Sequence, residues 1–298
     1  MKIRFGVGLG VGQSLDTPAQ LGDVVDLLEA LGFDSLWMSD RVTGGALDPI
    51  AALAFAAGRT TKLKLGTNVL VLPGRDPFLM ARQLAAVDQL SGGRLLPAVG
   101  LGSPSKADRP PFGVPKGTRA QRFEDGLAII RELWRDGGSV PHPDAGKTTT
   151  IDPRPTKPLE IWFGGRSVPA LQRAGRLSDG WIGSFQSPEQ CGEARRVIVD
   201  AATDAGRSID DDHYGTAIFY ARERRSEVGE FVVKALTESG GGHYVPEVLL
   251  PLGADELTAV IADYVAAGLS KFVLVPDQPD DWSAELTWLR EVTGPLET

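Results

Sequence analysis

The chain has 298 residues, of which 42% are hydrophobic and 23% are charged, enough to fill the core of one large α/β barrel or of two smaller domains. Its net charge of −8 argues against a nucleic-acid-binding surface, because phosphate contacts need clustered Lys and Arg, but it does not exclude a local basic pocket. The single cysteine, Cys191, excludes an internal disulfide, and every apolar run is broken well short of bilayer length. We therefore expect a cytoplasmic protein.

Strands and helices are predicted to alternate along the chain. The first helix begins in a capping box with proline at its first position, Thr17-Pro18-Ala19-Gln20, and Gly32 suits the residue after its end. The glycines of the first strand argue against a signal peptide, since no small-residue cleavage site accompanies them. In chain order we predict a strand at 3–10, a helix between Thr17 and Gly32, a strand at 35–39, a helix at 48–58, a strand at 64–72, a helix between Asp76 and Gly92, a strand at 95–101, a helix at 119–134, a strand at 160–163, a helix at 167–175, a strand at 180–185, a helix at 188–205, a strand at 214–221, a helix at 227–238, a helix around 257–265, a strand at 271–275 and a closing helix around 282–289.

This alternation runs through residues 1–298 without a dividing linker, so we predict one α/β domain folded as a (β/α)8 TIM barrel. Insertions are expected after strand 4, at 104–116, and after strand 7, at 222–252. Residues 137–158 are rich in Pro, Gly and Thr and are predicted to be irregular. A doubly wound open sheet is the alternative, although no G-x-G-x-x-G opens a helix after the first strand.

Polar or glycine-rich residues follow several predicted strands, at the sheet edge where parallel sheets bind ligands. Asp40 ends an apolar strand and is a candidate ligand-binding residue; a helix cap or an ion pair with Arg41 is the alternative. Asn68 interrupts an apolar strand, and its amide needs either a ligand or a hydrogen bond to a neighbouring strand. Residues 100–103, Gly-Leu-Gly-Ser, would let a flat ligand approach the backbone.

A candidate anion site follows the fifth predicted strand, where Gly164-Gly165-Arg166-Ser167 opens a helix. Backbone N–H groups and the helix dipole would point at one spot, and Arg166 could contact a phosphate with two hydrogen bonds. The alternative is a tight turn between strand and helix.

Other kinds of chemistry find little support in the sequence. No metal-binding spacing joins the histidines, no G-x-S-x-G is present, and Cys191 on a polar helix is interpreted as a structural thiol. The lysines that a Schiff base would need fall at strand starts, the stability face of a barrel. The chemistry is therefore expected to belong to a bound organic cofactor. The residues considered are His142, His213 and His243, and Lys62, Lys64 and Lys271.

At this point the chain resembles the luciferase-like monooxygenase superfamily, through motifs spread in order over most of its length. These motifs are 32–37 (GFDSLW) with Ser39-Asp40, 59–61 (RTT) before 65–69 (LGTNV), 89–94 (QLSGGR) before 99–102 (VGLG), the helix from Arg122 to Trp134, and 164–167 (GGRS) before 178–181 (SDGW). The resemblance implies a (β/α)8 barrel that binds FMN or the deazaflavin coenzyme F420 at the carboxyl ends of its strands.

The resemblance also implies roles for particular residues. A non-proline cis peptide of the family would fall at Asn68-Val69 and support the middle of the cofactor ring. Asp40 would contact the polar edge of the ring, and Gly100 and Gly102 would lie along it. Gly164, Gly165, Arg166 and Ser167 would take the phosphate.

Within the superfamily the pattern is most similar to F420-dependent oxidoreductases. Sugar-phosphate dehydrogenases of this group pair the second-strand Asp with a His, where this chain has Arg41, and carry a Glu where this chain has Ser103. Without that acid–base pair, hydride transfer from the reduced deazaflavin to an activated double bond or carbonyl is favoured over alcohol oxidation. The candidate catalytic residues are Asp40, Arg41 and Ser103, with Arg41 or Ser103 polarising the substrate.

Alternatives to this function are an FMN-dependent monooxygenase and a non-catalytic protein that binds a flavin or deazaflavin. A basic cluster could hold the polyanionic F420 tail, although an ordinary solvated stretch explains it equally well. We expect a small-molecule substrate and a homodimer, and neither a metal, nor a nucleic acid, nor a membrane as a partner. The basic residues are Lys106, Arg109, Lys116, Arg119 and Arg122.

Overall fold

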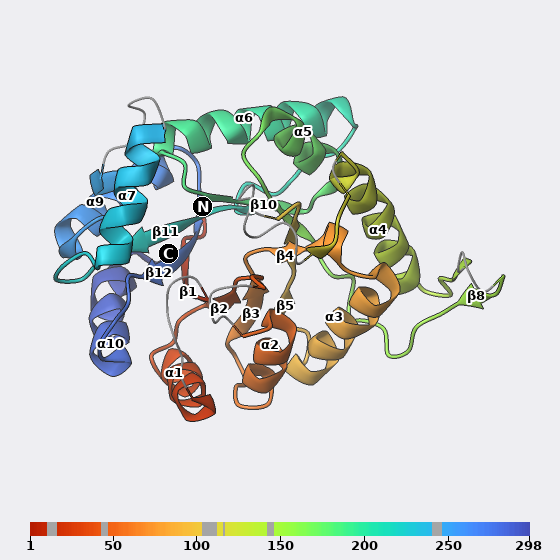
Figure 1. Ribbon diagram of the computed structural model, residues 1–298, viewed down its shortest axis with the longest axis horizontal. Coiled ribbons are helices and arrows are strands. Elements are labelled where there is room, and N and C mark those ends of the chain that lie inside the picture. Colours follow the sequence, from red (N-terminus) through yellow and green to blue (C-terminus); the bar gives the residue numbers. More distant parts are fainter. Residues whose placement is uncertain (11–16, 43–46, 103–111, 116, 142–145, 240–245) are drawn as a thin grey trace.

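The computed structural model describes residues 1–298 apart from 11–16, 43–46, 103–111, 116, 142–145 and 240–245, and in this part of the chain a curled sheet of ten parallel strands forms the centre (Figure 1). The strands are β1 (Arg4–Leu9), β2 (Ser35–Met38), β3 (Lys64–Thr67), β4 (Leu70–Val71), β5 (Leu95–Leu96), β6 (Ala98–Gly100), β9 (Trp162–Gly164), β10 (Gly180–Ser184), β11 (Tyr214–Tyr220) and β12 (Lys271–Pro276).

The sheet curls back on itself because two chain segments contribute to both of its ends. β3 and β4 belong to one segment, interrupted at Asn68-Val69, and β5 and β6 belong to another, interrupted at Pro97. β3 pairs with β5 at one end of the sheet, whereas β4 pairs with β6 at the other. Between them, β12 pairs with β1, so the last strand closes on the first. The result is a TIM-barrel-like α/β fold.

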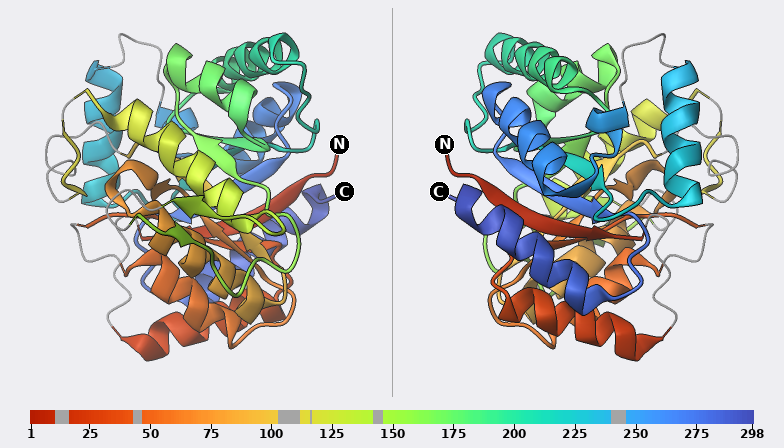
Figure 2. Two further views of the ribbon diagram at one scale, coloured as in Figure 1. Left: turned by 90° about the vertical axis from the view of Figure 1, so that its right-hand side faces the viewer. Right: turned by 90° about the vertical axis from the view of Figure 1, so that its left-hand side faces the viewer.

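Helices lie outside the sheet, as two side views show (Figure 2), and all but the short helix at 246–249 lie where helices were predicted. No helix in the described residues is long and apolar enough to cross a membrane. The helices are α1 (Pro18–Ala30), α2 (Pro49–Ala57), α3 (Pro77–Ser91), α4 (Arg119–Trp134), α5 (Val168–Leu177), α6 (Pro188–Asp204), α7 (Glu227–Ser239), α8 (Pro246–Leu249), α9 (Gly253–Ala266) and α10 (Trp282–Thr293), with short 3-10 turns η1 (Leu72–Gly74) and η3 (Gly294–Leu296).

The predicted helix ends are confirmed at the level of single hydrogen bonds. Thr17 forms the capping box with Gln20, and Asp76 accepts a 2.9 Å hydrogen bond from the N–H of Leu79. Gly32 and Gly92 adopt left-handed conformations, with φ of +73° and +66°, which glycine tolerates without a steric penalty.

Two stretches differ from the prediction. Residues 137–158, predicted to be irregular, contain a small antiparallel sheet of β7 (Val140–Pro141) and β8 (Thr148–Thr149). Residues 222–252 contain α7, where a helix was predicted at 227–238, and also the short helix α8, which was not predicted. Most of the predicted insertion at 104–116 lies outside the described residues.

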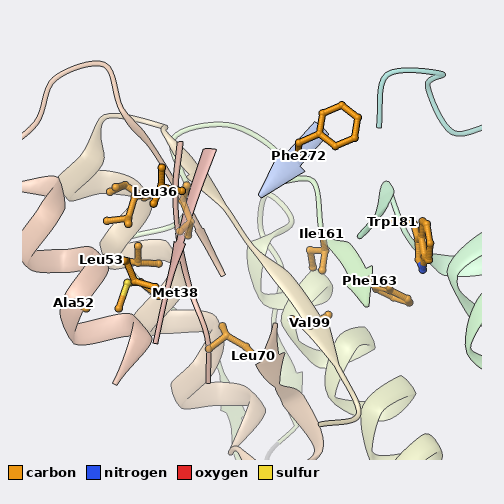
Figure 3. Close-up of a cluster of buried hydrophobic side chains, with 14 of the residues drawn as sticks. Leu36, Met38, Ala52, Leu53, Leu70, Val99, Ile161, Phe163, Trp181 and Phe272 are labelled. Carbon is orange, nitrogen blue, oxygen red and sulfur yellow. The ribbon is translucent and has the colours of Figure 1, made fainter. Parts of the chain in front are cut away.

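Side chains of the strands alternate between the helices and the barrel interior. Leu36 and Met38 of β2 point outward into the apolar layer that also holds Ala52 and Leu53 of α2 (Figure 3). Trp37, between them, instead belongs to a separate interior cluster. That cluster consists of Trp37, Ala98, Trp162, Ile182, Ala217, Val273 and Val275, with Val69, Leu96 and Phe219 packed against it.

Glycines make room for the two tryptophans of the barrel interior. A Cβ added at Gly66 would lie 2.4 Å from the indole of Trp37, and one at Gly180 would lie 2.4 Å from the indole of Trp162. A tryptophan on one strand therefore lies where the neighbouring strand carries a glycine.

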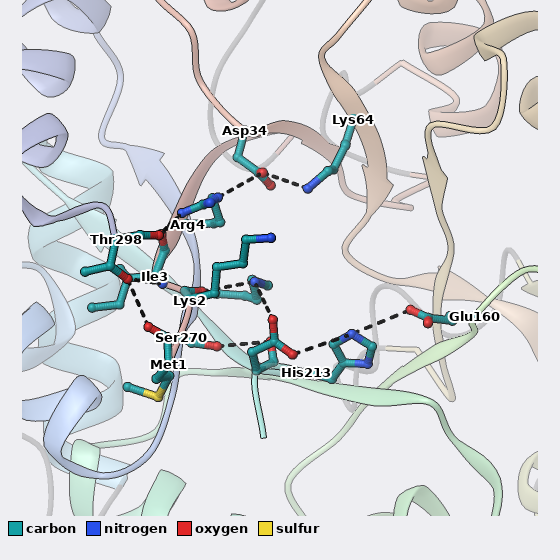
Figure 4. A network of polar contacts seen from close by, with 12 residues as sticks. Met1, Lys2, Ile3, Arg4, Asp34, Lys64, Glu160, His213, Ser270 and Thr298 are labelled. Atoms are coloured by element: carbon teal, nitrogen blue, oxygen red, sulfur yellow. Dashed lines mark hydrogen bonds and ion pairs between the residues drawn. The ribbon is translucent and has the colours of Figure 1, made fainter. Parts of the chain in front are cut away.

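Charged side chains gather at the edge of the sheet where the strands begin (Figure 4). Lys64 forms a 2.8 Å ion pair with Asp34, and Nζ of Lys271 donates to the carbonyl of Lys2 and lies 3.6 Å from Asp212. These two lysines hold the start of the sheet together, as predicted for the stability face, and Lys62 precedes β3 at the same edge.

Candidate active site

The predicted site residues come together at the carboxyl edge of the sheet. Asp40 follows β2, Asn68 follows β3, Gly100 ends β6 and Gly164 ends β9. β2 pairs with β3, β4 with β6, and β6 with β9, so these residues follow one another around the edge. This edge is where parallel barrels bind their ligands.

The peptide bond between Asn68 and Val69 is cis, where the resemblance predicted a non-proline cis bond. The backbone is held on both sides: the N–H of Asn68 donates to the carbonyl of Met38 at 2.9 Å, and Oγ of Ser39 donates to the carbonyl of Asn68 at 3.2 Å. Oγ1 of Thr67 bridges to the next strand, donating to the carbonyl of Ala98 and accepting from its N–H. The break in the third strand is thus an ordered part of the edge.

The side chain of Val69 fills the space beside two glycines. A Cβ added at Gly100 would lie 2.6 Å from Cγ2 of Val69, and one at Gly164 would lie 2.8 Å from its Cγ1. Gly102 makes similar room, since its Cβ would lie 2.8 Å from Cγ1 of Val71. The sequence suggested that these glycines admit a ligand; the structure gives them a nearer neighbour, a valine.

Asp40 is almost buried, with a side chain 3% exposed, and forms an ion pair with Arg75. Oδ1 accepts from Nη2 of Arg75 at 2.8 Å, and Oδ2 accepts from Nε of Arg75 at 3.1 Å and from the N–H of Val71 at 2.9 Å. An ion pair was the expected alternative, but its partner is Arg75 rather than Arg41. A carboxylate has about four lone-pair sites, so these three donors leave room for one more.

Arg75 was not singled out in the sequence, and it connects Asp40 with a second acid. Its Nη2 lies 3.3 Å from Oδ2 of Asp48, whose other oxygen caps α2 by accepting from the N–H groups of Ile50 and Ala51. Burial alone would lower the pKa of Arg75, but the carboxylates of Asp40 and Asp48 raise it above its ordinary value. The guanidinium therefore stays charged.

A groove of about 610 Å³ opens beside the predicted anion site. Arg166 and Ser167 line the groove just before α5 and are called the groove head. The carbonyl of Gly165 accepts a 2.9 Å hydrogen bond from Nε1 of Trp181. The groove is lined by Arg166, Ser167, Val168, Leu171, Gln186, Gln190, Glu193, Ala194, Val197 and Leu236.

The groove head offers fewer backbone donors than a typical helix start. Pro169 has no N–H, and the N–H of Ala170 already donates to the carbonyl of Ser167 at 2.8 Å. The N–H of Val168 is the first donor of the helix, and the hydroxyl of Ser167 and the guanidinium of Arg166 lie beside it; Nη1 of Arg166 also donates to the carbonyl of Phe185 at 3.5 Å. This set suits one small anionic group.

Gln186 in the groove wall is a buried polar side chain with an unsatisfied hydrogen-bond acceptor. It is 6% exposed, and among the described residues its Oε1 has no hydrogen-bond partner. A buried amide oxygen without a partner costs free energy, which a hydroxyl or N–H of a bound molecule would recover.

Of the remaining predicted residues, the structure describes Arg41, Arg119 and Arg122. Arg41 is exposed, and Arg122 is exposed on α4. Arg119 is partly buried, and its guanidinium lies 3.3 Å from the position of a Cβ at Gly102, beside the edge. The other predicted residues lie outside the described part of the chain: Ser103, Lys106, Arg109 and Lys116.

Three potential metal ligands meet away from this edge. Oxygens of Asp210 and Asp212 and a ring nitrogen of His213 lie within 4.8 Å of one another, before β11 begins. Nε2 of His213 also lies 3.8 Å from Glu160, as Figure 4 shows, and its Nδ1 contacts the carbonyl of Asp179 at 2.9 Å. The contacts to Glu160 and Asp179 identify His213 as part of the polar network that begins the sheet.

Comparisons with known proteins agree with this picture. The model of the family of luciferase-like monooxygenases matches residues 1–265. An F420-dependent glucose-6-phosphate dehydrogenase from Nakamurella multipartita is 28% identical over 223 residues, which cover 70% of this chain and 65% of that relative. The chain thus spans a little less than two thirds of that relative's length.

Solved structures share the whole fold at low sequence identity. An F420-dependent secondary alcohol dehydrogenase in complex with an F420-acetone adduct has a TM-score of 0.79 at 19% identity and covers 100% of both chains. The oxygenating constituent of 3,6-diketocamphane monooxygenase from Pseudomonas putida, in complex with FMN, has a TM-score of 0.75 at 16% identity and covers 98% of this chain and 97% of that one.

Proposed function

Because the chain belongs to the luciferase-like monooxygenase family, we propose that it is a coenzyme F420-dependent oxidoreductase, which acts on a small organic substrate and works as a reductase. The observation that carries the proposal is an apolar ledge, formed by Val69 between Gly100 and Gly164, next to a groove at the start of α5. A flat ring with a phosphate-bearing chain needs both features side by side.

The choice of F420 rests on the relatives. Curated relatives carry F420 in their names, including the dehydrogenase from Nakamurella multipartita and the putative oxidoreductase Rv3520c from Mycobacterium tuberculosis. When bound, F420 supplies or accepts a hydride at a ring carbon, where a flavin has a nitrogen that also supports oxygen chemistry.

The residues of this chain would hold such a cofactor at two places. Val69, flanked by Gly100 and Gly164, would support the ring together with Gly102, which lies beside Val71. Asp40 could offer its remaining lone pair to the ring's polar edge. At the groove head, Arg166, Ser167 and the N–H of Val168 would bind the phosphate, with Gly164 and Gly165 forming the turn. Gln186 would accept a hydrogen bond from a hydroxyl of the connecting chain.

The groove fits a single phosphate better than a run of carboxylates. Beyond Arg166 its wall is apolar at Val168, Leu171 and Val197 and acidic at Glu193. A polyanionic tail would therefore leave the site in another direction, such as towards Arg119 and Arg122 at the start of α4.

Reduction of an activated double bond or carbonyl is the proposed direction. An acid–base pair for alcohol oxidation would require a His next to Asp40 and an acid after the fourth-strand glycines, where this chain has Arg41 and Ser103. Asp40, Arg41 and Ser103 remain the proposed catalytic group, and a cationic Arg41 or the hydroxyl of Ser103 would polarise the substrate.

The finer fold assignment belongs to the same proposal. Counting β3 with β4 and β5 with β6 as single interrupted strands gives an eight-stranded (β/α)8 barrel in one domain, residues 1–298, with insertions after strands 4 and 7. We also propose a homodimer, by analogy with the family.

An FMN-dependent monooxygenase is the second candidate, because one fold neighbour is an FMN complex and a single phosphate at the groove head suits FMN equally well. A flavin- or deazaflavin-binding protein without catalytic activity is the third. Cofactor preference separates the first two, and turnover separates both from the third.

Titration of the purified protein with F420 and with FMN, following the fluorescence of each cofactor, tests the proposal. Tight binding of F420 alone, followed by oxidation of reduced F420 in the presence of unsaturated or carbonyl substrates, is the expected result. Arg166→Gln should weaken binding about tenfold, since it removes a charged hydrogen bond, whereas Arg176→Gln at the far end of α5 should not. Preference for FMN would overturn the deazaflavin assignment.

A further inference from the structure

Arg75 links three elements around the carboxyl edge of the sheet. Its guanidinium donates to both oxygens of Asp40, which follows β2, and reaches Asp48 at the start of α2. The chain enters Arg75 directly from η1, which follows β4. The Arg75 side chain is 21% exposed, so solvent screens this ion pair only in part.

Asp40 passes this connection on to the interrupted strand. The same Oδ2 that accepts from Nε of Arg75 accepts from the N–H of Val71 at 2.9 Å. Val71 pairs with Gly100 of β6, and its Cγ1 packs where a Cβ of Gly102 would be. Val69, two residues earlier, packs against Gly100 and Gly164. The position of the Val69–Val71 backbone thus depends on where the Asp40 carboxylate is held.

We propose that Arg75 is a positioning residue of the active site: by fixing Asp40, it holds Val69–Val71 against the glycines at the ends of β6 and β9, and so shapes the ledge on which the cofactor ring rests. The inference deepens the proposed function and rests on it for the role of the ledge.

The bidentate geometry is what a positioning role requires. A planar guanidinium fixes both the place and the tilt of a carboxylate, whereas a lysine ammonium fixes only its distance. Without Arg75, the nearly buried Asp40 would be left with one N–H partner, and an unpaired buried carboxylate reorients or draws in water. The Val71 N–H would then lose its acceptor.

Three variants test the proposal against a matched control. Arg75→Ala removes the guanidinium, Arg75→Lys keeps the charge without the bidentate contact, and Asp40→Asn removes the charge of its partner. Arg59→Ala is the control, because Arg59 forms a similar two-point contact with Asp26 on the outside of the barrel, between α2 and α1.

Two measurements are made on each protein: amide hydrogen exchange at Val71 without cofactor, and the dissociation constant of F420. In Arg75→Ala we expect exchange at Val71 and the dissociation constant each to rise about tenfold, the effect of losing one buried hydrogen bond. Arg75→Lys should recover part of the affinity, and Arg59→Ala should change neither quantity. In the double variant with Arg75→Ala and Asp40→Asn, the dissociation constant should rise by less than the product of the two single increases, because both substitutions remove the same contact.

The proposal is overturned if exchange at Val71 is the same in Arg75→Ala as in the unaltered protein, or if Arg59→Ala weakens binding as much as Arg75→Ala. If Arg75→Ala does not fold, Arg75→Lys decides. Full F420 affinity in Arg75→Lys would contradict the positioning role, because it would show that a positive charge alone is sufficient at this position. If the unaltered protein binds neither F420 nor FMN, the proposed function fails, while the exchange at Val71 still decides whether Arg75 holds the ledge.

Discussion

Gly100→Ala distinguishes two explanations for the glycine at the end of β6. The added Cβ would lie 2.6 Å from Cγ2 of Val69, about 1 Å inside an ordinary van der Waals contact. Cγ1 of Val69 lies beside Gly164, which limits how far the side chain can shift to relieve the clash. Overpacking of this kind costs about 1–3 kcal/mol, and we expect the free energy of unfolding to fall by about 2 kcal/mol.

The partner substitution should relieve the clash. Val69→Ala deletes both methyl groups of a partly buried side chain and should cost about 1–1.5 kcal/mol. If the two residues compete for one space, the double variant should be about as stable as Val69→Ala alone. Independent effects would instead add to about 3–3.5 kcal/mol, so the expected coupling is about 2 kcal/mol.

Urea unfolding of the cofactor-free protein, followed by tryptophan fluorescence, measures all four corners of this cycle. Gly58→Ala is the control, because Gly58 ends α2 with φ of −74° and its nearest neighbour to an added Cβ is 3.7 Å away. The reasoning is refuted if Gly100→Ala leaves the free energy of unfolding unchanged and weakens only cofactor binding. In that case the glycine serves the ligand, as the sequence alone suggested.

Two further predictions concern titratable groups outside the site. Glu29 accepts hydrogen bonds from the backbone of Thr61, Lys62 and Leu63; burial alone would raise its pKa, but these bonds lower the pKa from 4.5 to about 2. A lowered pKa stabilises the fold fully above pH 4.5 and progressively less as the pH falls towards 2. Because this carboxylate is partly exposed, we expect Glu29→Gln to reduce the free energy of unfolding by about 1–2 kcal/mol at neutral pH, less than the ~3.4 kcal/mol of the full shift, and by roughly 40% of that amount at about pH 3. Urea unfolding of both proteins across this pH range tests the prediction. It would be contradicted if the difference in free energy of unfolding between Glu29→Gln and the unaltered protein did not change with pH. Cys191 is buried in α6, and burial raises the pKa of its thiol to about 12, so a thiol reagent at about pH 8 should label it only after denaturant is added. Labelling of the native protein at the rate of a free thiol would show that the thiol is accessible.

The sequence predicts the elements of this fold well because their ends are encoded locally. The capping box at Thr17 and the Asp76-Pro77 start each involve residues within one helical turn, and the structure contains both. The same holds for the glycines that end α1 and α3. Periodic apolar residues then fix which face of each helix is buried.

The site was harder to predict because its contacts join distant residues. Arg75 lies 35 positions after Asp40, and nothing near either residue indicates the pair, so Arg41 stood as the nearest cation. The sequence indicated that some group comes close to the backbone at Gly100 and Gly102. It could not tell whether that group is a ligand or a valine side chain. The cis bond at Asn68-Val69 was predicted from the family resemblance and not from the residues themselves.

The pairing of tryptophan with glycine in the barrel interior has a consequence for how such a sequence can diverge. Any larger residue at position 66 or 180 collides with an indole, and any smaller residue at Trp37 or Trp162 leaves a void beside a glycine. Evolution is therefore expected to exchange these residues as linked pairs, with the bulky partner moving from one strand to its neighbour while the enclosed volume stays constant. Drift of this kind would let barrels keep their shape while few individual interior residues stay the same.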